Sequence, residues 1–300
     1  MKQHSSHGIF TSLIVIKIVC TQEWNYHELA EDMWPYIYVS CGSTQQSPID
    51  IQTSNTKYSK FETFKFSADY DTLINFTLQN NHYSIRTFDS IQEKLLTLEG
   101  GGLPGTFTFR QFHIHWGENI HQGSEHQVNG KKFSGEIHFV YLNFATNQTA
   151  VLSFLIEVIN NQTLENEIDY NTTSLWHSYI EKALLLNGGN ITYFMGNLSE
   201  FIPVHNLSKF YRYYNGSLTV PPCSGNVIWT IFNNTIKFLE DDITALHKII
   251  TDYNFREIQP LNGRIVSASF RDDQFDTGQI LRIKQWILFI YIIIIYFPNY

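Results

Sequence analysis

The stretch Thr106-Phe-Thr-Phe-Arg-Gln-Phe-His-Ile-His-Trp116 has the two-residue period of a β-strand. Its odd-numbered side chains, from Phe107 to His115, are expected on one face and its even-numbered side chains on the other. Bulky groups occur on both faces, so we expect residues 106–116 to form a strand in the interior of a sheet. His113 and His115 would then lie one pleat apart on the same face, a favourable arrangement for binding one metal ion.

A third histidine, His138, shares a face with Glu136 on another expected strand. If the two strands are neighbours, three imidazoles can converge on a single ion and leave its fourth position open, as in catalytic zinc sites. Gln111 and Glu136 each precede a histidine by two residues, and such acceptors orient the imidazoles that bind a metal. These neighbours favour a metal centre over the alternative of unrelated surface or core histidines.

Strand patterns dominate the rest of the sequence, and helical spacing occurs only locally. Between residues 24 and 270 there is no internal repeat, charge block or Pro/Gly-rich linker, so a single domain is expected. The expected fold class is predominantly β, a large sheet with short peripheral helices. The further expected elements are strands at 136–141 and 150–159 and helices at 175–186 and 243–250.

The composition is that of a globular protein, since 43% of the 300 residues are hydrophobic and 15% are aromatic. The formal net charge of −8 gives no basic surface for a phosphate backbone, so no nucleic acid partner is expected. The three cysteines contain no Cys-x-x-Cys pair. Cys20 ends an apolar N-terminal run, and its removal would leave Cys41 and Cys223 as an even pair.

Both ends of the chain carry apolar segments. Residues 1–20 have the length and flanks of a secretory signal peptide, although Lys17 interrupts the apolar run; a buried first strand is the alternative. Residues 286–297 are apolar but shorter than the roughly 20 residues of a spanning helix. Small and polar residues around Asp276 precede them, as in a glycolipid-anchor signal. A short or tilted span and a buried C-terminal strand are the alternatives.

The chain is therefore expected to consist of a signal peptide at 1–20, a domain at 21–275 and an anchor signal or short membrane tail at 276–300. We expect a glycoprotein at the outer face of the cell membrane, held by a lipid anchor, with a single-span or secreted form as the alternative. Asn-x-Ser/Thr sequons, the acceptors of N-glycans in secreted proteins, support export. They begin at Asn75, Asn147, Asn161, Asn171, Asn190, Asn197, Asn206, Asn215 and Asn233.

Several motifs, in their order along the chain, resemble the alpha-class carbonic anhydrases. The metal-binding stretch of that family is matched by Gln111-Phe-His-Ile-His-Trp-Gly117, Gly123-Ser-Glu-His126 and Glu136-Ile-His138. The resemblance covers about residues 24–270 and is closest to secreted and membrane-anchored members. Its other parts are Trp24, Tyr26, Trp34, Gln46-Ser-Pro-Ile-Asp-Ile51, Gly216-Ser-Leu-Thr-Val-Pro-Pro222, Val227-Ile-Trp229 and Asn254-Phe-Arg-Glu-Ile-Gln-Pro-Leu-Asn-Gly-Arg264.

The resemblance implies a large, twisted, mostly antiparallel sheet and the zinc-dependent, reversible hydration of carbon dioxide to bicarbonate and a proton. It also implies binding of sulfonamide-type inhibitors. The implied ligands of Zn²⁺ are His113, His115 and His138, and the acceptors implied to orient them are Gln111, Glu136 and the backbone carbonyl of Asn254.

Catalytic roles are implied in the same way. Thr219 would accept a hydrogen bond from the attacking hydroxide and donate its own proton to Glu125. His82 would carry protons to solvent, with Tyr26 on the connecting water network. Val220 would stand beside the substrate, where the family commonly has a threonine. The implied carbon dioxide pocket consists of Val140, Val151, Leu218, Val227 and Trp229.

The exported members of the family carry a disulfide at the positions of Cys41 and Cys223. Besides Val220, the chain departs from the family at Ile85, which replaces a polar residue of the cavity wall, and at Glu31-Asp-Met33, where a Gly-Pro is usual. Two alternatives share these motifs. One is a carbonic-anhydrase-like binding or adhesion module with little activity, and the other is a zinc ester hydrolase.

Overall fold

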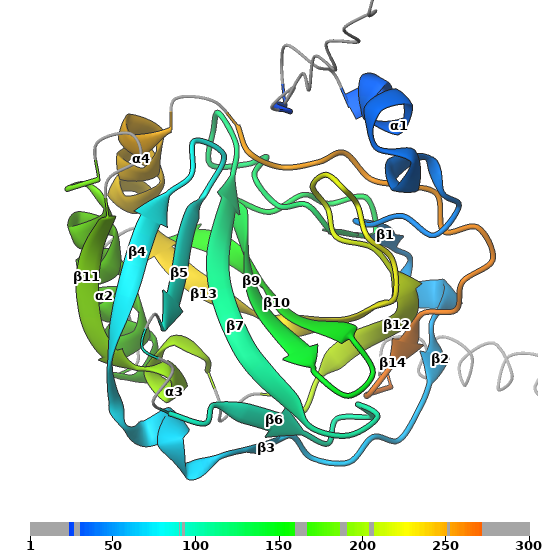
Figure 1. Ribbon diagram of the computed structural model, residues 1–300, viewed down its shortest axis with the longest axis horizontal. Helices are drawn as coiled ribbons and strands as arrows, with labels where there is room; N and C mark the ends of the chain where they lie inside the picture. The colour runs from blue at the N-terminus through cyan, green and yellow to red at the C-terminus, as the bar shows by residue number, and fades with distance from the viewer. Residues whose placement is uncertain are drawn as a thin grey trace, which may run out of the picture.

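One large twisted sheet curves through the computed structural model, with the helices α2 (Glu167–Ala183), α3 (Leu198–Phe201) and α4 (Glu240–Ile249) gathered at one side and α1 (Trp34–Ile37) apart from them (Figure 1). The predicted signal peptide and anchor signal lie outside the described residues. In the part of the chain that is described, no helix is both long and apolar enough to cross a membrane. The structure describes residues 24–26, 31–89, 91, 94–159, 167–186, 191–203, 207–250 and 253–271.

The large sheet has 12 strands. Its main path runs through β11 (Ile191–Asn197), β4 (Leu73–Asn80), β5 (Ile85–Asp89), β7 (Phe107–Trp116), β9 (Gly135–Asn143), β10 (Gln148–Ile159), β13 (Val227–Leu239), β12 (Phe210–Gly216), β14 (Ser267–Ala268) and β2 (Lys57–Tyr58). Beside this path, β6 (Thr97–Glu99) pairs with β7 and with β3 (Lys65–Phe66). A separate two-stranded sheet joins β1 (Asp50–Ile51) to β8 (Gln127–Val128).

Neighbours along the main path are antiparallel except for β10 with β13 and β14 with β2, so the mostly antiparallel sheet is confirmed. The three expected strands correspond to β7, β9 and β10, which lie side by side in the middle of the sheet. Because β7 pairs with β5 on one side and β9 on the other, its expected interior position is also confirmed.

Short helices cover one side of the sheet. The two expected helices are present as α2 (Glu167–Ala183) and α4 (Glu240–Ile249). Trp176 and Tyr179 of α2 are fully buried and pack on Phe112 of β7. The remaining helical segments are α1 (Trp34–Ile37), α3 (Leu198–Phe201) and 3-10 turns at Glu31–Met33, Val39–Gly42, Thr53–Asn55 and Ala68–Asp71.

The expected alternation along β7 is wrong in its first half. The register against β9 shifts between Phe109 and Gln111, which leaves Arg110 as a bulge. Phe107 and Phe109 consequently lie in the same buried cluster as Phe112 rather than on the face of the histidines. The bulge exchanges the two faces, so the face that carries His113 begins only at Gln111.

A disulfide joins Cys41 to Cys223, with Cα atoms 4.9 Å apart and a sequence separation of 182. Both cysteines are buried with Tyr26 and Trp34 in a small cluster of the N-terminal segment. Val220 packs against this cluster. The bridge therefore ties the N-terminal segment to the loop that follows Thr219.

Candidate metal centre

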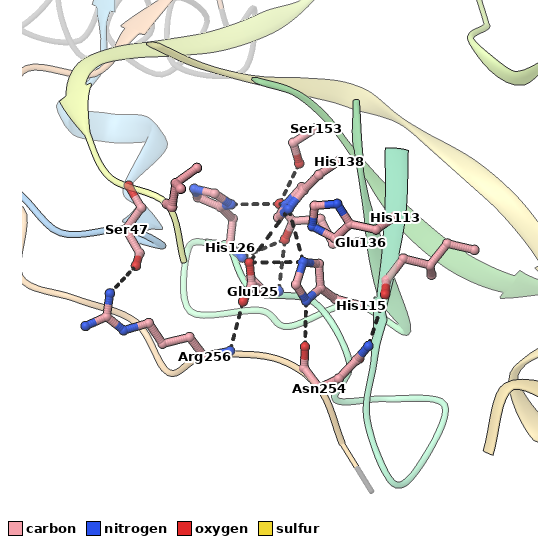
Figure 2. Close-up of polar contacts among 12 residues, drawn as sticks. Ser47, His113, His115, Glu125, His126, Glu136, His138, Ser153, Asn254 and Arg256 are labelled. Carbon is pink, nitrogen blue, oxygen red and sulfur yellow. Dashed lines mark hydrogen bonds and ion pairs between the residues drawn. The ribbon is translucent and has the colours of Figure 1, made fainter. Parts of the chain in front are cut away.

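Three histidines converge at the centre of the sheet (Figure 2). His113 of β7 is directly opposite His138 of β9, and His115 is opposite Glu136. The ring centroids of the three imidazoles are 4.6 to 5.2 Å apart. The two strands that carry the histidines are therefore neighbours, which is the condition for convergence given in the sequence analysis.

Each imidazole uses one ring nitrogen for a hydrogen bond and leaves the other facing the group. His113 Nδ1 donates to Gln111 Oε1 at 2.9 Å, and His115 Nδ1 donates to the carbonyl of Asn254 at 2.6 Å. His138 Nε2 donates to Glu136 Oε1 at 2.8 Å. The three orienting acceptors implied by the resemblance are therefore in contact with the three histidines.

Two of the facing nitrogens are close to the spacing that a tetrahedral zinc ion requires, and the ligand atoms of all three histidines lie within 4.8 Å of one another. His115 Nε2 and His138 Nδ1 are 3.1 Å apart. Two ligands of one zinc ion, each at about 2.0–2.1 Å, would be about 3.3 Å apart. Burial lowers the pKa of His113 and of His138, and it lowers the pKa of His115 to about 4. The imidazoles are therefore neutral, which is the form that binds metal.

Glu125 supplies a further sign that the group fits a cation. Its side chain is fully buried, and Oε2 has no hydrogen-bond partner among the described protein atoms. That oxygen lies 3.5 Å from His115 Nε2 and 3.8 Å from His138 Nδ1. A buried carboxylate oxygen without a donor carries a large desolvation penalty, which a metal ion with its bound water would relieve. The donor set, three neutral imidazoles, suits Zn²⁺.

Glu136 holds several parts of the centre together (Figure 2). Its Oε2 accepts the backbone N–H groups of Glu125 and His126, at 2.9 and 2.7 Å. Its Oε1 accepts from His126 Nδ1 and from Ser153 as well as from His138. Burial raises the pKa of Glu136, but its interactions with His126 and His138 outweigh burial and hold the pKa well below its usual range. Glu136 is therefore an anion that accepts at both oxygens.

Asn254 holds the end of β7 that carries His115. Its backbone N–H donates to Trp116 O at 3.1 Å, and its Oδ1 accepts from Trp116 N at 2.7 Å. Its Nδ2 donates to Ile114 O and to Tyr83 O, each at 3.1 Å. Four contacts thus hold the carbonyl that orients His115.

Thr219 and Glu125 lie together beside the histidines. Burial raises the pKa of Glu125, while His138, the Arg256 N–H and the nearby Thr219 side chain act to lower it. The N–H of Arg256 donates to Glu125 Oε1 at 2.9 Å. Thr219 is 4% exposed, so its hydroxyl is held in the interior. Thr219 therefore lies near enough to Glu125 to act on its carboxyl group, but no hydrogen bond joins the two side chains among the contacts of the described residues.

An apolar wall adjoins the centre. Trp229 stacks edge-on against His138 with ring centroids 4.8 Å apart. Val151, Val227 and Trp229 belong to one buried cluster, against which Val140 and Leu218 pack. The structure therefore gathers the five residues of the expected carbon dioxide pocket.

The cavity that reaches the histidines has a volume of about 180 Å³. The structure does not bring His82 into it. His82 is exposed within the β4–β5 loop and has a φ of 72°. The next residue, Tyr83, lines the cavity instead. The positive φ turns the chain at His82. The residue that matches the family motif is therefore His82, whereas the residue that faces the cavity is Tyr83. The lining residues are Trp24, Tyr26, Asn81, Tyr83, Ser84, Arg86, Gln111, His113, His115 and Val220.

Sequence reasoning missed three contributors. His126 bridges Glu136 and the hydroxyl of Tyr213, 2.8 Å from its Nε2, and its place at the end of Gly123-Ser-Glu-His126 was a signal for such a role. Arg256, 2% exposed, links Glu125 to the N-terminal segment, because it also donates to Gln46 Oε1 at 2.7 Å and Ser47 O at 3.0 Å. No local sequence pattern predicts the contact of Arg256 with Gln46 and Ser47, which are about 210 residues away in the sequence.

Glu31 is the third. Its carboxylate accepts the N–H of Glu257 at 3.1 and 3.2 Å and lies 3.8 Å from Arg256 Nε. Burial raises the pKa of Glu31 to about 7. The segment that lacks the usual Gly-Pro is therefore attached by a carboxylate to residues 256–257, next to the Asn254 that orients His115.

Comparison of the sequence with known proteins points to the same family as the motifs around the metal centre. Residues 29–270 match the family described as eukaryotic-type carbonic anhydrase. The chain is similar to carbonic anhydrase 12 of Homo sapiens, with 29% identity over 93% of this chain and 84% of that protein. It is similar to carbonic anhydrase 4 of Rattus norvegicus, with 30% identity over 83% and 82%, and to carbonic anhydrase 6 of Canis lupus familiaris, with 28% identity over 82% and 80%.

Proposed function

The chain belongs to the eukaryotic-type carbonic anhydrase family and is a carbonic anhydrase, and on this premise we propose that it interconverts carbon dioxide and bicarbonate on a zinc ion held by His113, His115 and His138. The observation that carries the proposal is the convergence of three neutral imidazoles, each with its own acceptor, beside the unpartnered Glu125 Oε2. A bound Zn²⁺ would lower the pKa of a water molecule to about 7, an effect for which carbonic anhydrase is itself the reference case.

The residues of the chain would orient the reactants. Thr219 would donate its proton to Glu125, accept a hydrogen bond from the attacking oxygen and so fix the direction of its lone pair. The wall of Val140, Val151 and Trp229 would hold carbon dioxide, which is apolar. Gln111, Glu136 and Asn254 would keep the imidazole tautomers fixed.

The proton released in each turnover has to reach solvent. The resemblance implies His82 for this transfer, but the exposed position of His82 outside the cavity lining does not support it. We therefore propose that buffer molecules take the proton at the cavity mouth, past Tyr26 and Tyr83. Both side chains line the cavity.

Metal analysis combined with a carbon dioxide hydration assay tests this function. The wild-type chain should contain one zinc per molecule and lose activity with a chelator. His138→Ala should lose both metal and activity, because two imidazoles do not hold the site, whereas His121→Ala, an exposed histidine away from the centre, should lose neither. A wild-type chain without metal or activity would instead support the binding-module alternative. A sulfonamide should inhibit, as the family implies.

We further propose that the enzyme acts at the outer cell surface as a lipid-anchored glycoprotein. The Cys41–Cys223 disulfide supports export, because such bridges persist in oxidising compartments. The apolar run at 286–297 is shorter than the roughly 20 residues that a helix needs to span a membrane, and small residues precede it. A phosphatidylinositol-specific phospholipase should release active enzyme from intact cells. Retention on the cells, with recovery of peptides that contain Trp286, would instead establish a membrane span.

A further inference from the structure

The cavity contains a cation that the resemblance does not account for. Arg86 of β5 is directly opposite His113 of β7, so the two side chains lie on the same face of the sheet. Arg86 lines the cavity together with His113 and His115. Its side chain remains exposed, so it is in reach of molecules that enter.

Arg86 has no counter-ion in the described part of the molecule. No carboxylate is among the residues that line the cavity, and no ion pair of Arg86 occurs among the described residues. The guanidinium lies over the ring of Phe88, 5.6 Å from its centroid, which leaves its N–H groups without an anionic acceptor. Arg110 is close enough to act on it as a like charge.

The location of this charge is notable because the chain as a whole is acidic, with a net charge of −8. The overall field repels anions, whereas Arg86 attracts them at one point. Amide and hydroxyl groups of Asn81, Ser84 and Gln111 line the same cavity and can add hydrogen bonds. A guanidinium beside such groups is suited to planar oxyanions, which it can bind through two N–H groups.

We propose that Arg86 forms an anion subsite in the cavity that binds bicarbonate and small carboxylates and so makes the enzyme selective for charged over neutral ligands. This inference rests on the proposed function for its location beside the metal centre. Carbon dioxide is uncharged, so Arg86 acts on the anionic side of the reaction and leaves the binding of carbon dioxide unchanged.

Benzoate and benzamide make a matched pair of probes, because they share a shape and differ in charge. Calorimetry on the zinc-loaded protein should show that Arg86→Gln weakens benzoate roughly three- to tenfold and benzamide less than about twofold. Arg86→Lys should retain most of the benzoate affinity. Arg110→Gln removes the same charge from the next strand, outside the cavity lining, and should have little effect. The benzoate affinity of the wild type should also fall with added salt.

Equal losses in Arg86→Gln and Arg110→Gln would overturn the subsite, because they would reflect overall charge alone. Unchanged benzoate affinity in Arg86→Gln, or no benzoate binding by the wild type, would also overturn it. The two proposals fail separately. Calorimetry needs no turnover, so a chain that binds benzoate through Arg86 but hydrates no carbon dioxide would contradict only the proposed function.

Discussion

His113 and His138 are directly opposite each other on β7 and β9, and this pairing places two ligands on adjacent antiparallel strands in the middle of the sheet. The ladder that joins β7 to β9 continues on both sides, into β5 and β10. Movement of either imidazole would therefore require distortion of several strands. The centre is preorganised by the sheet itself, and the side-chain acceptors fix only the rotation of each ring.

Replacement of Thr219 tests whether orientation by this hydroxyl contributes to turnover. Thr219→Ala should lower kcat roughly a hundredfold, because it removes a hydrogen bond aimed at the attacking oxygen in a preorganised site. Thr219→Ser keeps the hydroxyl and should keep most of the activity. Stopped-flow hydration assays and zinc analysis would follow both variants. A wild-type rate in Thr219→Ala, or loss of its zinc, would contradict the role.

The proton path is tested by His82 and its neighbour. His82→Ala should lower kcat at low buffer concentration by less than about threefold, far below the roughly hundredfold that a positioned general base contributes. Tyr83→His should raise kcat under the same conditions, because it places a group with a pKa near 6.5 on the cavity wall where a phenol now stands. A large loss in His82→Ala, restored by imidazole, would support the role that the resemblance implies.

The parts of the site that the sequence predicts are those fixed by strand geometry. His113 and His115 share a face because the period of a strand is two, and this holds whatever the strand order is. The bulge at Arg110 was not predictable, because it exists only in the pairing of β7 with β9. Which loop residue faces inward depends on the φ of His82, which the residue types do not determine.

Contacts between segments far apart in the sequence are a second kind of feature that could not be predicted. Glu31 and Arg256 come together only in the folded chain, where the N-terminal segment lies against residues 256–257. An acidic residue in a polar stretch otherwise indicates an exposed side chain. The family resemblance marked the segment as unusual through the absent Gly-Pro, but the partner of Glu31 required the fold.

The disulfide should contribute several kcal/mol to stability. A closed loop of 182 residues corresponds to about 5 kcal/mol by chain-entropy reasoning, since the bridge restricts the unfolded chain. The double variant Cys41→Ser/Cys223→Ser should therefore show a reduced free energy of unfolding in urea. Wild-type protein kept under reductant is the matched control and should behave in the same way. Peptide mapping that finds both thiols free in protein isolated without reductant would contradict the bridge.

Glu31 should make stability depend on pH between about 4.5 and 7. Its folded-state pKa, raised by burial to about 7, exceeds the ordinary value of 4.5, so the folded protein binds more protons than the unfolded chain in this range. Stability therefore falls as the pH rises through it and is constant, as far as this group is concerned, above it. The charged groups that act on Glu31 are Arg256, Glu125 and Glu257.

Glu31→Gln separates this effect from other titrations, because glutamine resembles the protonated acid. The free energy of unfolding of the variant should nearly equal that of the wild type near pH 4 and exceed it by on the order of 3 kcal/mol near pH 8. Glu257→Gln changes an exposed neighbour and should show no such crossover. Urea titrations at both pH values supply the measurement. A variant less stable than the wild type near pH 8 would mean that the Arg256 ion pair outweighs the burial of the carboxylate.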